Sequence, residues 1–161
     1  ASNVPDIGAR AGDPFPHASE VARYLEPAVQ DLVALSVNAK QAHWHVRGHN
    51  FIAVHEYLDV VYTNASDAAD LLAERVIALG EPVDARLSEV ASRSNTPELS
   101  VGFQDSQTSI TEVIEQIDAV RQTVLRAVKA LEEPDPVSHD LAVSVAQTLD
   151  KDRWFLSAQL G

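Results

Sequence analysis

The chain contains no cysteine and no methionine among its 161 residues. Disulfides and thiolate metal sites are therefore excluded, so a transition metal would have to be bound by histidine and carboxylate side chains. Cysteine and methionine are also the side chains that peroxide oxidises most readily, so their absence suits a protein that handles oxidants. Chance or base composition explains the absence equally well.

Basic residues are scarce, because twelve Lys and Arg stand against twenty-four Asp and Glu, a net charge of −12. A body of this charge repels a phosphate backbone and attracts cations. Apolar runs are short as well, and none approaches the ~20 residues needed to cross a bilayer. The first residues lack the basic and apolar regions of a signal peptide. We therefore expect a cytoplasmic protein without a membrane segment.

Residues 51–80 have the pattern of one long helix. Apolar side chains recur there every three or four residues, which is the spacing of a buried helical stripe. Gly80, followed by Pro82, supplies the end of the helix. The stripe consists of Val54, Leu58, Val61, Ala65, Ala68, Leu72, Val76 and Leu79.

Four potential metal ligands lie on this helix as two pairs spaced i, i+4. The first pair is His55 with Asp59, and the second is Asp70 with Glu74. At about 100° per residue, all four fall on the side away from the apolar stripe. His55 and Asp70 are on the order of 22 Å apart along the axis, so one chain cannot bring both pairs to one metal ion.

A second copy of the chain removes this difficulty. Two such helices that cross antiparallel about their common midpoint put His55 opposite the partner's Glu74 and Asp59 opposite the partner's Asp70. An isologous interface brings identical patches together in this way, which predicts two equivalent metal sites for each pair of subunits. The alternative is that the acids form a solvated helix face and the histidine is structural.

The rest of the chain predicts three more long helices. Residues 1–16, rich in Pro and Gly, indicate a flexible N-terminal arm, and residues 17–161 form one domain. The first helix follows a cap at Ser19 and reaches Gly48, with Pro27 either kinking it or opening its main part. The third covers residues 106–131, and the fourth follows Pro136. The long connection 81–105, with a short helical turn near residues 87–91, permits a crossover between the second and third helices.

The first helix has a second apolar stripe that faces away from the bundle. Both apolar faces have to be buried, and we expect the bundle to bury one and another subunit to bury the other. This second stripe consists of Val29, Val33, Val37 and Trp44.

The segment KQAHWHVRGHNFIAVHEYLD at residues 40–59, the spacing Asp70-x3-Glu74-Arg75 and the closing LDKDRWFL resemble the Dps family, the mini-ferritins named as DNA-binding proteins from starved cells. The resemblance implies an all-α, ferritin-like four-helix bundle with a short extra helix in the crossover. It also implies a hollow homo-oligomer of twelve subunits with tetrahedral symmetry. The family's ferroxidase site lies at the two-fold interface, the arrangement that the ligand spacing also indicates.

The resemblance assigns the metal ligands residue by residue. His43, His55 and Asp59 match the ligands from one subunit, and Asp70 and Glu74 match those from its partner. The family oxidises Fe(II), typically with hydrogen peroxide, and stores ferric mineral inside the shell, which protects against oxidative damage. Imidazole and carboxylate ligands suit iron, and an incomplete ligand set leaves positions open for the oxidant.

Other residues match the family less specifically. Trp44 matches a tryptophan thought to quench or relay oxidising equivalents, although interface packing explains it equally well. The acidic residues Glu133, Asp135 and Asp140 resemble those that line three-fold iron-entry pores, with an ordinary acidic loop as the alternative. His45 and His49 depart from the usual pattern and are either exposed loop histidines or extra metal ligands.

The leading hypothesis is therefore an iron-storing ferroxidase. A metal-dependent hydrolase of amides or esters is an alternative, because a His/carboxylate metal with open positions also activates water. A nucleoid DNA-binding protein is a third hypothesis. The net charge opposes it, the arm has no Lys, and the chain stops at Gly161, so we expect weak or absent DNA binding.

Overall fold

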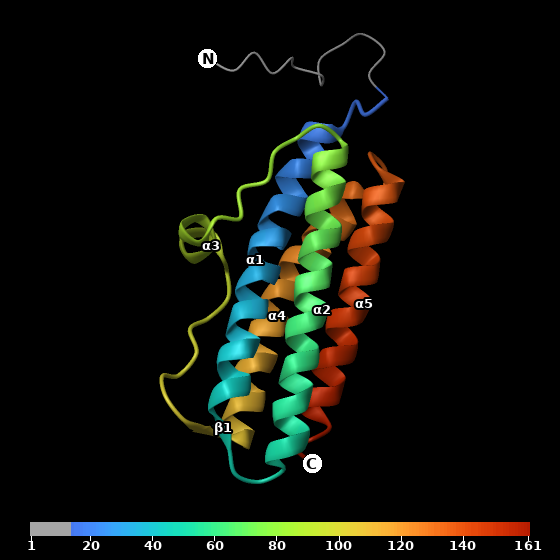
Figure 1. The fold of residues 1–161 in the computed structure, drawn as a ribbon. Helices are drawn as coiled ribbons and strands as arrows, with labels where there is room; N and C mark the ends of the chain where they lie inside the picture. The colour runs from blue at the N-terminus through green and yellow to red at the C-terminus, as the bar shows by residue number, and fades with distance from the viewer. Residues whose placement is uncertain (1–13) are drawn as a thin grey trace.

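The computed structural model describes residues 14–161, so most of the predicted arm lies outside the described residues. Four long helices form an elongated bundle, and a short helix stands beside it in the crossover (Figure 1). The predicted ferritin-like architecture with a fifth, short helix is confirmed. The elements are α1 (Ala18–His45), β1 (Val46–Arg47), α2 (Phe51–Ala78), α3 (Leu87–Arg93), β2 (Gln104–Asp105), α4 (Ser106–Leu131) and α5 (Pro136–Ser157).

The bundle consists of two helical hairpins. α1 packs along α2, α4 packs along α5, and the hairpins meet where α1 lies on α4 and α2 lies on α5. Every member of the apolar stripe predicted on α2 is buried. The core also takes in fully buried leucines from α1 and β-branched residues from α4, so it follows the whole length of the bundle.

α1 differs from its prediction at its start and at Pro27. The helix begins at Ala18, after His17, and Ser19 lies inside it rather than capping it. Pro27 lies within the continuous helix. Its neighbours Leu25 and Ala28 are fully buried, so packing holds the helical conformation across the proline.

The second stripe of α1 is partly covered by the chain itself. Val29 is 2% exposed and Val33 is half-buried, because the crossover with α3 packs along this side of α1. The expectation that another subunit covers the whole stripe is therefore wrong at Val29. Val37 and Trp44, further along α1, remain more than half exposed.

Polar side chains attach the crossover to the bundle. The buried carboxylate of Asp31 accepts a hydrogen bond of 2.8 Å from the Asn95 backbone N–H. Gln30 Nε2 donates to the carbonyl of Asp84 at 3.0 Å. At its far end the crossover pairs in parallel with the α1–α2 connection, with Val46 opposite Gln104. Within the described residues, none of the helices is long and apolar enough to span a membrane.

Candidate metal centre

His43 near the end of α1 and His55 near the start of α2 lie face to face. Their ring centroids are 3.7 Å apart and their planes differ by 15°. Each ring bonds to the backbone of the other residue: His43 Nδ1 lies 2.6 Å from the His55 carbonyl oxygen, and His55 Nδ1 lies 2.7 Å from the His43 carbonyl oxygen. The His43 carbonyl belongs to the last turn of α1, where helical partners run out.

These reciprocal bonds decide where each imidazole carries its proton. A carbonyl oxygen only accepts, so each Nδ1 must be the donor. In the neutral ring the other nitrogen, Nε2, then keeps its lone pair, which is the form that binds a metal ion. A ligand histidine commonly has its second nitrogen fixed in this way, and here both are fixed before any metal arrives.

Asp59 lies one turn of α2 after His55 and supplies a carboxylate. Lys40 of α1 donates a hydrogen bond to its Oδ1, and this bond is the main cause of a lowered Asp59 pKa. The charges of Lys40, His43 and His55 lower that pKa further. The Lys40 ammonium also lies 4.6 Å from the ring centroid of Tyr62. Asp59 is therefore ionised at neutral pH and already holds a cation.

Large apolar side chains surround these three residues. Trp44 is 62% exposed and Ile52 is 61% exposed, while Phe51 stacks on His55 with ring centroids 5.0 Å apart. The exposed apolar residues continue along α2 to Ile77. Apolar groups gathered on an exposed surface of this kind mark an interaction site.

The structure stacks His43 on His55, with Asp59 near enough for their charges to lower its pKa, and leaves Asp70 and Glu74 apart. The last two are exposed near the other end of α2. Residues 14–161 contain no cluster of three or more His, Asp or Glu side chains that could hold a metal ion. The spacing argument is consistent with this separation, since it assigns the two pairs to different subunits.

Asp135, predicted at a pore, has a structural role in the single chain. It accepts hydrogen bonds from the first backbone N–H groups of α5 and pairs with Arg75, whose Nη2 lies 3.0 Å from Oδ2. Burial acts to raise the pKa of Asp135, but hydrogen bonds from Ser138 and Arg75 outweigh it and hold the pKa below its usual value. Glu133 and Asp140 are exposed on either side.

The two extra histidines do not join the ligands in this chain. His45 Nδ1 lies 2.9 Å from the Gln41 carbonyl oxygen, and its ring lies beside that of Phe103, with centroids 5.5 Å apart. Arg47 lies over the same phenyl ring at 3.2 Å. His49 is exposed in the α1–α2 connection.

A polar cluster inside the bundle was missed by the sequence analysis. Asp152 of α5 is 2% exposed and accepts hydrogen bonds from Tyr57 Oη at 2.8 Å and Asn64 Nδ2 at 3.0 Å. Burial raises the pKa of Asp152, and the two hydrogen bonds reduce the shift. Burial also raises the pKa of Tyr57, and the bond to Asp152 adds to it. Asp152 lies between Leu149 and Leu156 in the buried stripe of α5. An acidic residue at a position where the periodicity expects an apolar one is the signal that could have identified it.

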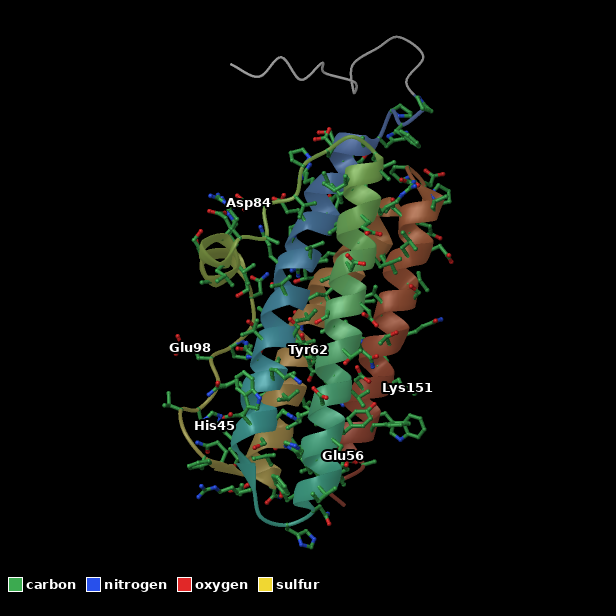
Figure 2. All side chains as sticks on the ribbon, viewed as in Figure 1. His45, Glu56, Tyr62, Asp84, Glu98 and Lys151 are labelled. Carbon is green, nitrogen blue, oxygen red and sulfur yellow. The ribbon has the colours of Figure 1, made fainter. Side chains whose placement is uncertain are left out.

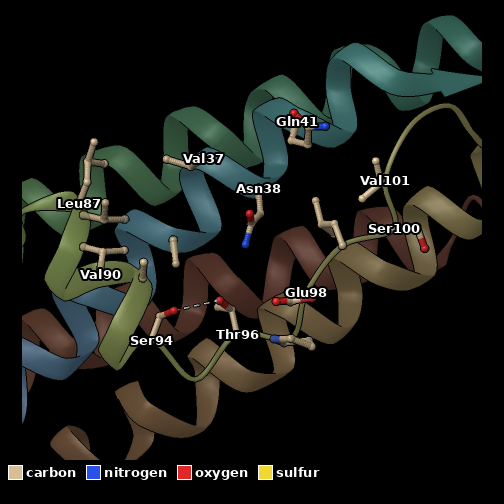
Figure 3. A pocket seen from close by; sticks show the side chains of 15 residues that line it. Val37, Asn38, Gln41, Leu87, Val90, Ser94, Thr96, Glu98, Ser100 and Val101 are labelled. Carbon is tan, nitrogen blue, oxygen red and sulfur yellow. Dashed lines mark hydrogen bonds between the residues drawn. The ribbon is translucent and has the colours of Figure 1, made fainter.

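A cavity of about 680 Å³ lies between α1 and the crossover, away from all five predicted ligands (Figure 3). Val37 and Asn38 of α1 face Leu87 and Val90 of α3 across it. The candidate metal centre is a partly exposed half-site on α1 and α2. The side chains on the outer face of α2, including Glu56 and Tyr62, are drawn in Figure 2.

Comparison with known proteins agrees with the fold. The Ferritin family, described as a ferritin-like domain, matches residues 22–161. The DNA protection during starvation protein of Agrobacterium fabrum is 31% identical over 143 residues, which cover 88% of each chain. The structure of Dps from Microbacterium arborescens in the high iron form superposes with a TM-score of 0.88 and is 45% identical, covering 94% of this chain and 99% of that one. Dps92 from Deinococcus radiodurans gives a TM-score of 0.84 at 30% identity, covering 89% and 87%. The chain therefore belongs to the Dps family of ferritin-like proteins.

Proposed function

We propose that this protein is an iron-storing ferroxidase that oxidises Fe(II), preferably with hydrogen peroxide, and keeps the ferric product inside a dodecameric shell. The observation that carries the proposal is the pair His43 and His55, whose Nε2 atoms are free to bind a metal beside the ionised Asp59. The relative from Microbacterium arborescens, described as a high iron form, supports it.

The donor set suits Fe(II) as a substrate. Imidazole nitrogen and carboxylate oxygen both bind Fe(II), and three ligands from one chain leave positions for further ligands and for the oxidant. The Lys40 ammonium occupies Asp59 in the iron-free chain, so Fe(II) has to displace this cation when it binds. The carboxylate is therefore kept ionised and oriented until the substrate arrives.

The other half of the site comes from a two-fold related copy. In the antiparallel arrangement, the partner's Asp70 and the partner's Glu74 complete the ligand set. The exposed apolar residues beside the half-site, such as Ile52 and Ile77, supply the contact surface that such an interface needs. Each pair of subunits then contains two complete sites.

Two further roles belong to the same proposal. Trp44, on the last turns of α1 next to His43, quenches oxidising equivalents that escape the site. Glu133, Asp135 and Asp140 surround an iron-entry pore between subunits. The exposed carboxylates of Glu133 and Asp140 supply the negative field there, since Asp135 is paired with Arg75.

The test is to load the iron-free shell with Fe(II) without oxygen and then add peroxide. We expect ferric absorbance that stays in solution and elutes with the protein on size exclusion. His55→Ala combined with Asp59→Ala should slow the reaction by about 100-fold or more while the shell persists. Glu56→Ala is the matched control, because it removes an exposed acid between the two ligands. Wild-type rates in the double variant would overturn the proposal.

DNA binding is a separate matter, raised by the name of the Agrobacterium relative. A net charge of −12 opposes contact with a phosphate backbone, so we predict weak or absent binding at physiological salt. A gel shift at moderate ionic strength tests this, and tight retention of DNA by the assembled protein would contradict it.

A further inference from the structure

Tyr57 and Asp152 form a pair that the metal site does not use. The phenol of Tyr57 on α2 donates to Oδ1 of Asp152 on α5 at 2.8 Å, and Asn64 Nδ2 lies 3.0 Å from both carboxylate oxygens. Asp152 is 2% exposed. A buried carboxylate is costly, so its presence inside an otherwise apolar stripe calls for a role.

Asp152 is the hydrogen-bond acceptor of this cluster. Tyr57 Oη and Asn64 Nδ2 both donate to its carboxyl group, and these bonds favour the ionised form against burial, which raises the pKa of Asp152. The Tyr57 hydroxyl therefore points at a carboxyl oxygen. A phenol in this position can lose an electron and hand its proton to the neighbour in the same event.

Tyr57 lies close to the candidate metal centre without facing it. It is two residues after His55 and two before Asp59, which places it about 200° around the axis of α2 from each. Its ring is thus separated from the metal ligands by the width of one helix, about 10 Å. An electron can cross this distance, whereas peroxide and iron cannot.

Peroxide takes up two electrons and each Fe(II) gives one, so a first Fe(II) that reacts before the second leaves an oxidant that is one electron short. We propose that Tyr57 is a one-electron donor in peroxide reduction and that Asp152 takes its proton, an assignment that rests on the proposed function. Tyr57 thereby stores the oxidising equivalent that would otherwise leave as a hydroxyl radical.

The reaction proceeds in three steps. A first Fe(II) gives one electron to hydrogen peroxide, the O–O bond breaks, and one hydroxide and one oxidant at the level of the hydroxyl radical result. Tyr57 gives an electron to that oxidant, which becomes the second hydroxide, while the phenolic proton moves to Asp152 Oδ1. A second Fe(II) then reduces the Tyr57 phenoxyl radical, and the proton returns from Asp152. The sum is two Fe(II) and one peroxide converted to two Fe(III) and two hydroxides.

Two aromatic rings of α5 lie beside Tyr57. Its ring lies 5.3 Å from that of Phe155, and the phenyl group of Phe155 meets the exposed Trp154 edge-on at 4.7 Å, all distances between centroids. Tyr57 itself is half-buried. The proposed radical therefore forms beside two exposed aromatic rings, on the side of α2 away from the ligands.

The first experiment mixes iron-loaded shells with peroxide, freezes them within milliseconds and records electron paramagnetic resonance spectra. With ring-deuterated tyrosine in the protein, the wild type should show a phenoxyl signal that narrows on labelling. Tyr57→Phe should remove the signal and increase the yield of spin-trapped hydroxyl radical. Asp152→Asn, which keeps Tyr57 but removes the proton acceptor, should lower the radical yield about tenfold.

Tyr24→Phe and Tyr62→Phe are matched controls, since they remove the two other tyrosines of the chain and should leave the signal unchanged. Circular dichroism melting identifies any variant that fails to fold. An unchanged phenoxyl yield and unchanged spin trapping in Tyr57→Phe would overturn the inference.

A second experiment separates this inference from the proposed function. Iron-free protein is oxidised by a flash-excited photosensitiser with a sacrificial electron acceptor, and the phenoxyl absorbance is followed in time. The wild type should form the radical, Tyr57→Phe should form far less, and Asp152→Asn should form it more slowly. Normal iron oxidation with no Tyr57 radical in either experiment leaves the proposed function standing and overturns the inference. Absent iron oxidation with a normal flash result overturns the proposed function and the role of Tyr57 within it.

Discussion

The two ends of α2 carry the same number of predicted ligands in different surroundings. At the amino-terminal end, His55 is bonded to the backbone of α1 and Asp59 to Lys40. At the carboxyl-terminal end, Asp70 and Glu74 are exposed, and within residues 14–161 neither forms an ion pair. One half of the proposed site is thus organised inside each chain, whereas the other half is held only by the helix and depends on docking.

The largest expected effect comes from mixing two inactive variants. Asp59→Ala damages the amino-terminal half of the site and Glu74→Gln the carboxyl-terminal half, so each alone should lose nearly all peroxide-dependent iron oxidation. When the two are unfolded and reassembled together, mixed pairs contain one intact site and one doubly damaged site. With random pairing, about a quarter of all sites are restored, and the initial rate should recover accordingly.

The control for this rescue mixes Asp59→Ala with His55→Ala. Both changes lie in the same half, so every site in a mixed pair stays damaged and no recovery is expected. Equal recovery in the two mixtures, or none in the first, would show that the ends of α2 do not meet across subunits.

Lys40→Ala tests whether the amino-terminal half is held by a competing cation. Removing the ammonium takes away a positive charge that repels an arriving divalent metal ion, which is worth about 30-fold in affinity at a separation of about 4 Å in water. We expect tighter binding of Co(II), used as a stand-in that does not react with peroxide, in calorimetric titrations. Weaker binding would show instead that Lys40 mainly orients Asp59. Lys129→Ala, on α4, is the control.

Asp135 pairs with Arg75 near the carboxyl-terminal end of α2. Asp135→Ala removes the cap of α5 and should lower the free energy of unfolding by about 1–2 kcal/mol, measured from urea midpoints. Asp135→Asn keeps a capping side chain and should cost less, because only the ion pair is weakened. Equal losses in both variants would mean that the ion pair, and not the cap, stabilises this end.

The smallest expected effects concern the pH dependence of stability. Asp135 and Asp152 both contact α2, and folding shifts their pKa values in opposite directions. The pKa of Asp135 is lowered by folding, so its stabilisation is full above about pH 3.9 and is lost as the pH falls through the lower, folded pKa. The pKa of Asp152 is raised, so stability declines as the pH rises from about 3.9 through its folded pKa. Unfolding midpoints measured across this range should respond less to acid in Asp135→Asn, and should decline less with rising pH in Asp152→Asn. The same pH response in both variants would contradict this assignment.

Sequence periodicity predicted much of the bundle, since α2 and α4 begin and end within two residues of their expected bounds. Periodicity did not decide whether Pro27 kinks the first helix or opens its main part. Proline disfavours a helix interior, but buried neighbours on both sides keep this helix continuous. Periodicity also missed that the crossover covers Val29. A connection held by side-chain bonds to Asp84 and Asn95 has no periodic pattern from which its path could be deduced.

The candidate site also combines features that the sequence predicts with features that it does not predict. The predicted ligands come from residue spacing on one helix and from the family resemblance. Spacing and resemblance can be recognised because each depends only on the order of residues along the chain. The interlocked rings of His43 and His55 could not be predicted, since they depend on how closely α1 and α2 approach and on which backbone carbonyl each ring meets. Asp152 could have been noticed in its stripe, but its partners lie on another helix.

The interlocked imidazoles determine how the centre would fail. Each ring is bonded to the main chain of the other residue and not to the other ring, so chemical damage to one imidazole removes one bond and leaves the second in place. A single lesion then removes one ligand while the neighbouring imidazole stays oriented. Such a centre would lose its capacity in steps, one histidine at a time.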